Sequence, residues 1–130
     1  MRIKIDKLDT LFSKYIRLRA GGKCDFCGRV FHDKIKENGD VYPAWKSLQV
    51  SHFHGRRKRS LRYDPDNAIG ACADCHFFLG ENPYVHTEFF RKRLGSERFE
   101  QLNIRAEIIA KPDKKAIEAS LKERIKLLEV

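Results

Sequence analysis

Long apolar runs are missing from this chain of 130 residues. None of its stretches approaches the roughly 18 consecutive apolar residues of a membrane-spanning helix, so no membrane partner is expected. The first ten residues, MRIKIDKLDT, lack the apolar segment of a secretory signal, which favours a cytoplasmic location. Internal repeats and low-complexity linkers are absent too. The length is that of one domain, and we expect residues 1–130 to form a single unit.

Acidic residues are the minority among the charged side chains. The chain holds 27 lysines and arginines against 18 aspartates and glutamates, a formal net charge of +9. Such an excess favours a polyanionic partner, most simply nucleic acid. The charge is clustered, because residues 55–63 contain five basic side chains and no acidic one. These five, which we expect to grip phosphates rather than form only a solvated loop, are Arg56, Arg57, Lys58, Arg59 and Arg62.

Only four cysteines occur, in the two pairs Cys24-x-x-Cys27 and Cys72-x-x-Cys75. Paired motifs of this kind in a chain without a secretion signal indicate zinc ligands rather than disulfides. Their spacing fits one tetrahedral site with four thiolate ligands. Because four thiolates leave no open coordination position, this Zn²⁺ is expected to be structural and to help hold a small core together.

Apolar spacing and capping residues predict an N-terminal helix and a helical C-terminal part. Asp6 can cap a first helix to about Ala20, where Arg17 and Arg19 either complement the helix dipole or face DNA. Residues 36–40 are predicted to turn and 41–53 to be extended. Further helices are expected from about residue 73, over 83–94, from 96 and from 112. The last carries an apolar stripe, which packs on the domain or pairs with another subunit: Ile117, Leu121, Ile125 and Leu128.

A histidine–asparagine–histidine order lies among the cysteine pairs. His52 stands at the expected end of a strand, Asn67 in a loop, and His76 directly after Cys75 at the start of a helix. In that order the first histidine can take a proton from water, and the helix-borne histidine can bind a divalent cation that stabilises charge on a phosphate. Asn67 would hold the loop and the base. The plainer alternatives are a surface histidine at 52 and support of the zinc thiolates at 76.

With these residues the chain resembles HNH (His-Me finger) endonucleases with a treble-clef zinc site. It is most similar to the phage recombination nucleases of the NinG/Rap family, over roughly residues 8 to 100. The layout is also similar to endonuclease VII-type junction resolvases, which carry Asp-His-x-His between two CxxC pairs and a metal ligand after the last cysteine. Besides the cysteines, the matching residues are Tyr15-Ile16-Arg17-Leu18-Arg19, Ser51-His52, Leu61-Arg62-Tyr63, Asn67, His76 and Gly80-Glu81-Asn82 with Tyr84.

The resemblance implies an α+β fold: an N-terminal helix over residues 1–22, a treble-clef ββα-metal core over 23–82, and a helical part over 83–130 with a possible dimer interface. It implies hydrolysis of branched DNA, such as Holliday junctions or D-loops, by a phage or prophage protein in a bacterial host. Resolving a junction needs two cuts, so a homodimer is expected. His52 would be the general base, and His76 would hold catalytic Mg²⁺ or Mn²⁺.

One departure from the resolvase pattern is Ser51, which stands where an acidic metal ligand precedes the catalytic histidine. His54, Asp64, Asp66 or His86 could substitute, and His54 is favoured because alternate strand residues face the same side. Two other functions stay open. One is an HNH nicking enzyme on ordinary duplex DNA, linked to phage packaging. The other is a non-catalytic zinc module that binds DNA or RNA.

Overall fold

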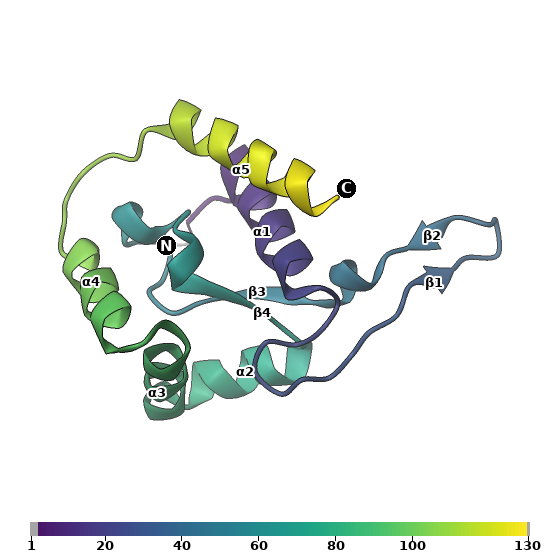
Figure 1. The fold of residues 1–130 in the computed structure, drawn as a ribbon, viewed down its shortest axis with the longest axis horizontal. Helices are drawn as coiled ribbons and strands as arrows, with labels where there is room; N and C mark the ends of the chain where they lie inside the picture. Colours follow the sequence, from purple (N-terminus) through teal and green to yellow (C-terminus); the bar gives the residue numbers. More distant parts are fainter. Residues whose placement is uncertain (1–2, 130) are drawn as a thin grey trace.

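The computed structural model describes residues 3–129, which form a mixed α+β fold (Figure 1). Within that range lie five α-helices, two antiparallel sheets of two strands each, and three short 3₁₀ turns. The helices are α1 (Lys7–Ala20), α2 (Ala73–Glu81), α3 (Pro83–Leu94), α4 (Ser96–Ala106) and α5 (Lys114–Leu128). The strands are β1 (Lys34–Ile35), β2 (Val41–Tyr42), β3 (Gln49–His52) and β4 (Ala68–Ala71). None of these helices combines the length and apolar character needed to span a bilayer.

Reciprocal capping starts α1 where the sequence predicts it. Asp6 Oδ1 accepts a hydrogen bond from the Asp9 backbone N–H at 2.8 Å, and Asp9 Oδ2 accepts one from the Asp6 N–H at 2.8 Å. This pair satisfies two amides that no helical carbonyl can reach. Gly21 ends the helix in the left-handed region with φ +67°.

A hairpin of β3 and β4 forms the centre of the molecule. Gln49 pairs with Ala71 at one end of this hairpin and His52 with Ala68 at the other. The helix α1 covers one face and α2 lies on the other side (Figure 1). Gly70 allows the close approach of α1, because a Cβ at this position would lie only 2.8 Å from Ala20 Cβ. His52, the last residue of β3, therefore lies in a sheet that is packed between α1 and α2.

Two apolar clusters stabilise this arrangement. The first surrounds the cysteines and joins β4 to α2, α3 and α4. The second joins α1 to α5, and here Leu121 and Ile125 are buried while Ile117 is partly buried. The predicted C-terminal stripe thus packs on its own domain through three of its members, and only Leu128 stays exposed. This stripe is not free to serve as a subunit interface.

Several boundaries differ from the sequence-based expectation. The segment 41–53, expected to be extended with a break at Pro43, is indeed interrupted there, and the interruption is the 3₁₀ turn Ala44–Ser47 between β2 and β3. The N-cap of α4 is Gly95 rather than Ser96, and Ile109 lies beyond its end, fully exposed. Asp113 caps α5 by accepting a hydrogen bond from the Ala116 N–H, so the helix starts at Lys114, two residues after Pro112.

Candidate functional site

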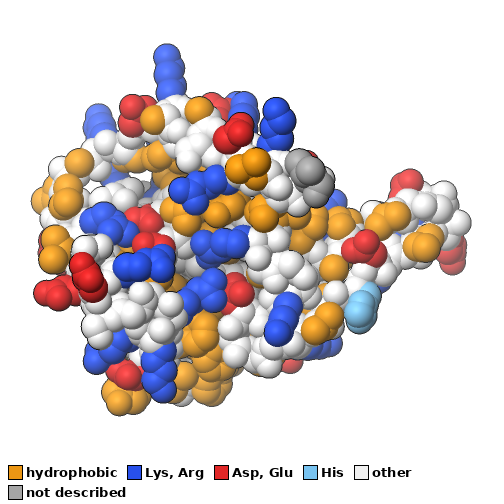
Figure 2. Space-filling model, viewed as in Figure 1, with side chains coloured by type: hydrophobic (Ala, Val, Ile, Leu, Met, Phe, Trp, Pro, Cys, Tyr) orange, Lys and Arg blue, Asp and Glu red, His pale blue; other side chains and the backbone are white. Residues whose placement is uncertain are grey.

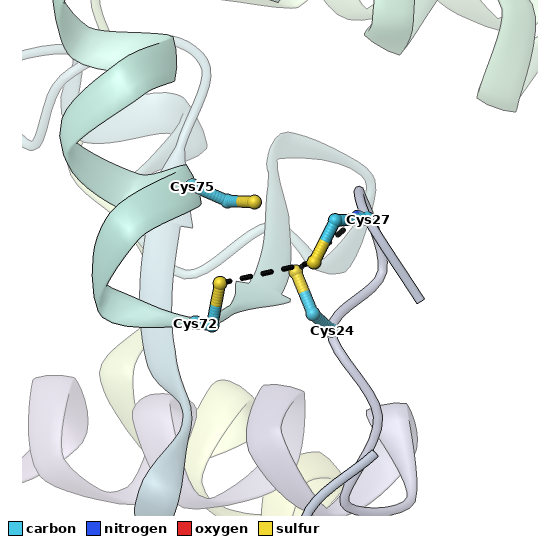
Figure 3. Close-up of side chains that lie close together, drawn as sticks. All are labelled: Cys24, Cys27, Cys72 and Cys75. Atoms are coloured by element: carbon cyan, nitrogen blue, oxygen red, sulfur yellow. Dashed lines mark hydrogen bonds between the residues drawn. The ribbon is translucent and has the colours of Figure 1, made fainter. Parts of the chain in front are cut away.

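The four cysteines meet in one cluster, with their sulfurs pointing toward one another (Figure 3). Cys24 and Cys27 lie in a tight turn after α1, while Cys72 caps α2 and Cys75 lies in its first turn. All four Sγ atoms lie within 4.8 Å of one another, and none forms a disulfide. A tetrahedral site with Zn–S bonds of about 2.3 Å has sulfurs about 3.8 Å apart. The Cys27 and Cys72 sulfurs are 3.9 Å apart, so the cluster fits Zn²⁺.

Local backbone geometry prepares one of these thiols for metal binding. Burial raises the pKa of Cys24, but hydrogen bonds from the backbone of Cys27, Cys72 and Phe26 outweigh it and lower the pKa to about 7. Burial also raises the pKa of Cys75, and the neighbouring thiols of Cys72, Cys27 and Cys24 raise it further. A divalent cation is the group that stabilises all four sulfurs as thiolates.

His52 lines a cavity of about 560 Å³ between α1 and the end of β3. Its ring hydrogen-bonds to the backbone of Arg62 and lies 5.6 Å from the Phe12 ring, measured between centroids. Among residues 3–129 its Nε2 has no hydrogen-bond partner. Burial lowers the pKa of His52, although the bond to Arg62 opposes this shift. The result is a neutral imidazole with one nitrogen bonded to the Arg62 backbone and with Nε2 buried and unpartnered, so water reaches Nε2 only when its surroundings shift.

His76 lines the same cavity from α2 and is exposed. Its Nδ1 lies 2.7 Å from Gln49 Oε1, an oxygen that can only accept, so Nδ1 carries the proton and Nε2 keeps its lone pair. A histidine that binds a metal commonly donates its other N–H to such an acceptor. Gln49 is a residue that the sequence reading missed. The available signal is the alternation of β3, which places Gln49 and Ser51 on the face toward α2.

His54 does not join the two cavity histidines. Its Nε2 lies 2.8 Å from Asn103 Oδ1 on α4, and it is not among the residues that line the cavity. The reason is that β3 ends at His52, so the strand alternation that would place His54 beside it does not extend that far. The expectation that His54 is the second metal ligand lacks support from this geometry.

Asn67 is fully buried and ties the basic loop to the hairpin. Its Oδ1 accepts from the His54 backbone N–H at 2.8 Å, and its Nδ2 donates to the carbonyls of His54 at 2.8 Å and Leu61 at 3.3 Å. These bonds hold the segment that follows His52. Arg62 ends that segment, and its backbone contacts the His52 ring. Asn67 therefore occupies the loop-holding position that the sequence pattern predicts.

The other residues considered as substitutes for an acidic ligand are engaged elsewhere. Asp64 and Asp66 form ion pairs with Arg105 and Arg98. His86 packs against Phe53 and Phe90, and burial lowers its pKa.

Ser51 is buried, with only 2% of its surface exposed, and it does not line the cavity. Asp9 is the one carboxylate among the lining residues of the cavity, and it is paired with Arg62.

The seven predicted DNA-binding residues fall into three groups. Arg17 and Arg56 line the cavity. The guanidinium of Arg19 donates to the carbonyls of Pro65 at 3.1 Å and Ala68 at 2.8 Å, and Arg62 pairs with Asp9. These two arginines tie α1 to the β3–β4 connection. Arg57, Lys58 and Arg59 line a separate groove beside α4.

No family model, curated protein or solved structure matches this chain. The chemistry of the site is therefore inferred from its own residues: a cluster of four cysteines beside a cavity with two histidines and two arginines. The cysteine pairs flank β3 and β4 in the sequence, and Cys72 directly joins β4 to α2. A metal in the cluster would thus fix the relative positions of the elements that carry His52 and His76.

Proposed function

We propose that this protein is a metal-dependent DNA endonuclease with His52 as the general base. The observation that carries the proposal is the state of the His52 ring, which is held through the Arg62 backbone, kept neutral by burial and unpartnered at Nε2. A neutral imidazole with an unpartnered nitrogen can accept a proton from water. The proposal requires a shift that opens the buried Nε2 to the cavity that His52 lines. The resulting hydroxide attacks a phosphorus atom, and the bond from phosphorus to the leaving oxygen breaks.

Charge around the cavity supports a phosphate substrate. Arg17 and Arg56 line the cavity, and Lys and Arg side chains are spread over the face of the molecule that Figure 2 shows. Guanidinium groups hold phosphate oxygens with directional hydrogen bonds, which positions a backbone without reading its bases. DNA shape or branching, rather than base sequence, is the property such a site can select.

His76 is the residue we assign to a catalytic divalent cation, through its Nε2. Gln49 orients this ring, and Mg²⁺ or Mn²⁺ commonly keeps several waters and uses only one or two protein ligands together with substrate phosphates. Such a cation, when bound, neutralises charge that develops on the scissile phosphate. The four cysteines would hold a structural Zn²⁺ that takes no part in this chemistry.

At a finer level we propose an HNH-type core in which β3, β4 and α2 form the ββα-metal unit and the cysteines form a treble clef. The order of these elements and the position of His76 directly after Cys75 support this assignment. The resemblance to junction-cleaving nucleases makes branched recombination intermediates in a phage or prophage context the proposed substrate. Two cuts on a junction would require two copies of the chain.

The decisive experiment compares a labelled four-way junction with a matched linear duplex. Zinc-loaded protein is assayed with Mg²⁺, with Mn²⁺ and without added metal, beside His52→Ala. We expect metal-dependent paired cuts on the junction by the wild type, and loss of cleavage with near-normal DNA binding by the variant. Equal cleavage by His52→Ala would refute the role of this histidine. Cutting of both substrates would instead favour a nicking enzyme on duplex DNA.

A non-catalytic zinc module that binds DNA or RNA is the second candidate. Its supporting observation is that Ser51 is buried and that Asp9, the one carboxylate among the described residues that line the cavity, is paired with Arg62. Under this alternative the protein binds both substrates and cuts neither in any metal. The same assay therefore separates the two functions.

A further inference from the structure

The hairpin of β1 and β2 projects from the body of the molecule (Figure 1). We call residues 33–42 the hairpin arm. Its tip is well ordered by local contacts, because Asn38 and Asp40 exchange hydrogen bonds of 2.9 and 3.0 Å and Gly39 adopts φ +89°. Its strands are only two residues long, and an isolated two-stranded hairpin is marginally stable in water. The arm is thus a tip closed by local hydrogen bonds on a pair of very short strands.

One face of the hairpin arm is apolar and uncovered. Ile35 and Val41 are directly opposite in the strand register, and 78% and 56% of their surfaces are exposed. The arm also differs from the rest of the chain in charge, since it contains two lysines and three acidic residues, a net charge of −1, in a chain of +9. Figure 2 shows hydrophobic and acidic side chains along this projection.

A groove with the opposite charge lies beside the link between α4 and α5. We call it the linker groove; its volume is about 580 Å³, and residues 57–59 and 106–111 line it. Ile108 and Ile109 are exposed here, by 53% and 103%. The lining contains four basic residues and one acidic residue, Glu107, a net charge of +3. None of these residues lines the cavity of His52.

We propose that the hairpin arm of one copy docks in the linker groove of a second copy. Ile35 and Val41 would pack on Ile108 and Ile109, which removes apolar surface of both copies from water. The acidic residues of the arm would meet the cations of the groove, and this complementarity fixes the choice of partner.

The geometry of the chain allows this contact to close into a dimer. The hairpin arm and the linker groove lie at opposite ends of the long axis of the molecule (Figure 1). Two copies that lie side by side and antiparallel would each place an arm at the other's groove, so the contact forms twice about one two-fold axis. The dimer interface thereby moves away from the C-terminal stripe, which α1 already covers.

Analytical ultracentrifugation of the zinc-loaded full chain, without DNA, tests this proposal separately from any nuclease activity. The wild type is compared with an arm variant, Ile35→Asp with Val41→Asp, and a groove variant, Ile108→Asp with Ile109→Asp. The control is Leu127→Asp, which alters another exposed aliphatic side chain, on α5. We expect the wild type and the control to be dimers. Each double variant should raise the dimer dissociation constant by more than about a hundredfold, because both contacts lose two aliphatic side chains.

Mixing the two variants gives the sharpest result. The arm variant keeps an intact groove and the groove variant an intact arm, so one of the two contacts can re-form and a heterodimer should appear in the mixture. Raising the salt concentration should weaken the wild-type dimer. A monomeric wild type, a dimeric arm or groove variant, or a mixture that stays monomeric would each overturn the proposal. Circular dichroism and a zinc content of one ion per chain establish that the variants are folded.

Discussion

At the scale of single residues, burial of His52 has a consequence for pH dependence. Because burial lowers the pKa of this ring below its usual value of about 6.5, the base is already neutral at neutral pH. We predict that the single-turnover cleavage rate rises with pH through a midpoint below 6.5 and is level by neutral pH. Below that midpoint the ring is protonated and cannot accept a proton from water. A midpoint at or above 6.5 would contradict the assignment.

Gln49 gives a second prediction at this scale. If it orients His76 for metal binding through the 2.7 Å contact, Gln49→Ala should raise the metal concentration for half-maximal cleavage by about 10 to 100-fold. Gln49→Glu keeps an acceptor for the Nδ1 proton, so it should stay close to the wild type or bind metal more tightly. Titration of Mn²⁺ in the cleavage assay measures both. Equal metal dependence of the wild type and Gln49→Ala would exclude the positioning role.

Asn67 is expected to stabilise the folded protein. Its buried amide makes three hydrogen bonds to the backbone, and Asn67→Ala would leave the His54 N–H and two carbonyls without that partner. We predict a loss of about 2–4 kcal/mol in the free energy of unfolding, measured by urea denaturation. Gln101→Ala, on the exposed side of α4, should change it by less than about 0.5 kcal/mol. A similar small effect at Asn67 would show that the loop does not depend on this side chain.

At the scale of elements, the contact of α1 with β4 depends on Gly70. A Cβ at this position would meet Ala20 Cβ at 2.8 Å, so Gly70→Ala must push the helix away from the hairpin. We predict a loss of about 1–3 kcal/mol in the free energy of unfolding. Gly80→Ala is the matched control, because its Cβ would meet nothing within 4 Å and alanine favours a helix by up to about 1 kcal/mol. Thermal unfolding of both variants should therefore move in opposite directions.

The sequence predicts well those elements whose positions are determined by residues close to them in the chain. The capping pair of Asp6 and Asp9 starts α1, and the glycine after Ala20 ends it, and each signal acts on the backbone next to it. The two CxxC pairs likewise predict the cysteine cluster, because each pair supplies two metal ligands from one short segment. Such signals need no knowledge of distant segments.

The sequence does not reveal which residue, distant in the chain, a given side chain contacts. Arg19 and Arg62 are basic residues in motifs that suggest DNA contact, yet their acceptors lie more than 40 positions away in the chain. The apolar stripe of α5 fits a subunit interface as well as it fits α1. His54 turns to Asn103 because its strand ends two residues earlier. Each of these outcomes depends on packing rather than on local pattern.

At the scale of the whole molecule, the cysteine cluster should control stability. It joins the turn after α1 to the start of α2, and the first apolar cluster includes three of its four cysteines, so loss of the metal affects both. We predict that Cys72→Ser, or removal of Zn²⁺ by a strong chelator, lowers the melting temperature sharply or unfolds the chain. Circular dichroism with zinc quantification measures the melting temperature and the metal content. Adding Zn²⁺ back should restore the melting temperature of the chelated wild type but not that of Cys72→Ser. A chelated protein with unchanged melting would show that the cluster does not need a metal.

The packing of α5 on α1 also has a consequence for biosynthesis. The helix that forms one wall of the His52 cavity is made first, whereas the helix that buries its outer face is made after every other described element. Until α5 emerges, the nascent chain lacks part of the apolar contacts of α1 and exposes hydrophobic surface that favours aggregation. The residues concerned are Leu8, Phe12 and Ile16. Ribosomes that stall before α5 would thus release products prone to aggregation, with an incompletely supported cavity. Emergence of α5 from the ribosome is the event that closes this wall.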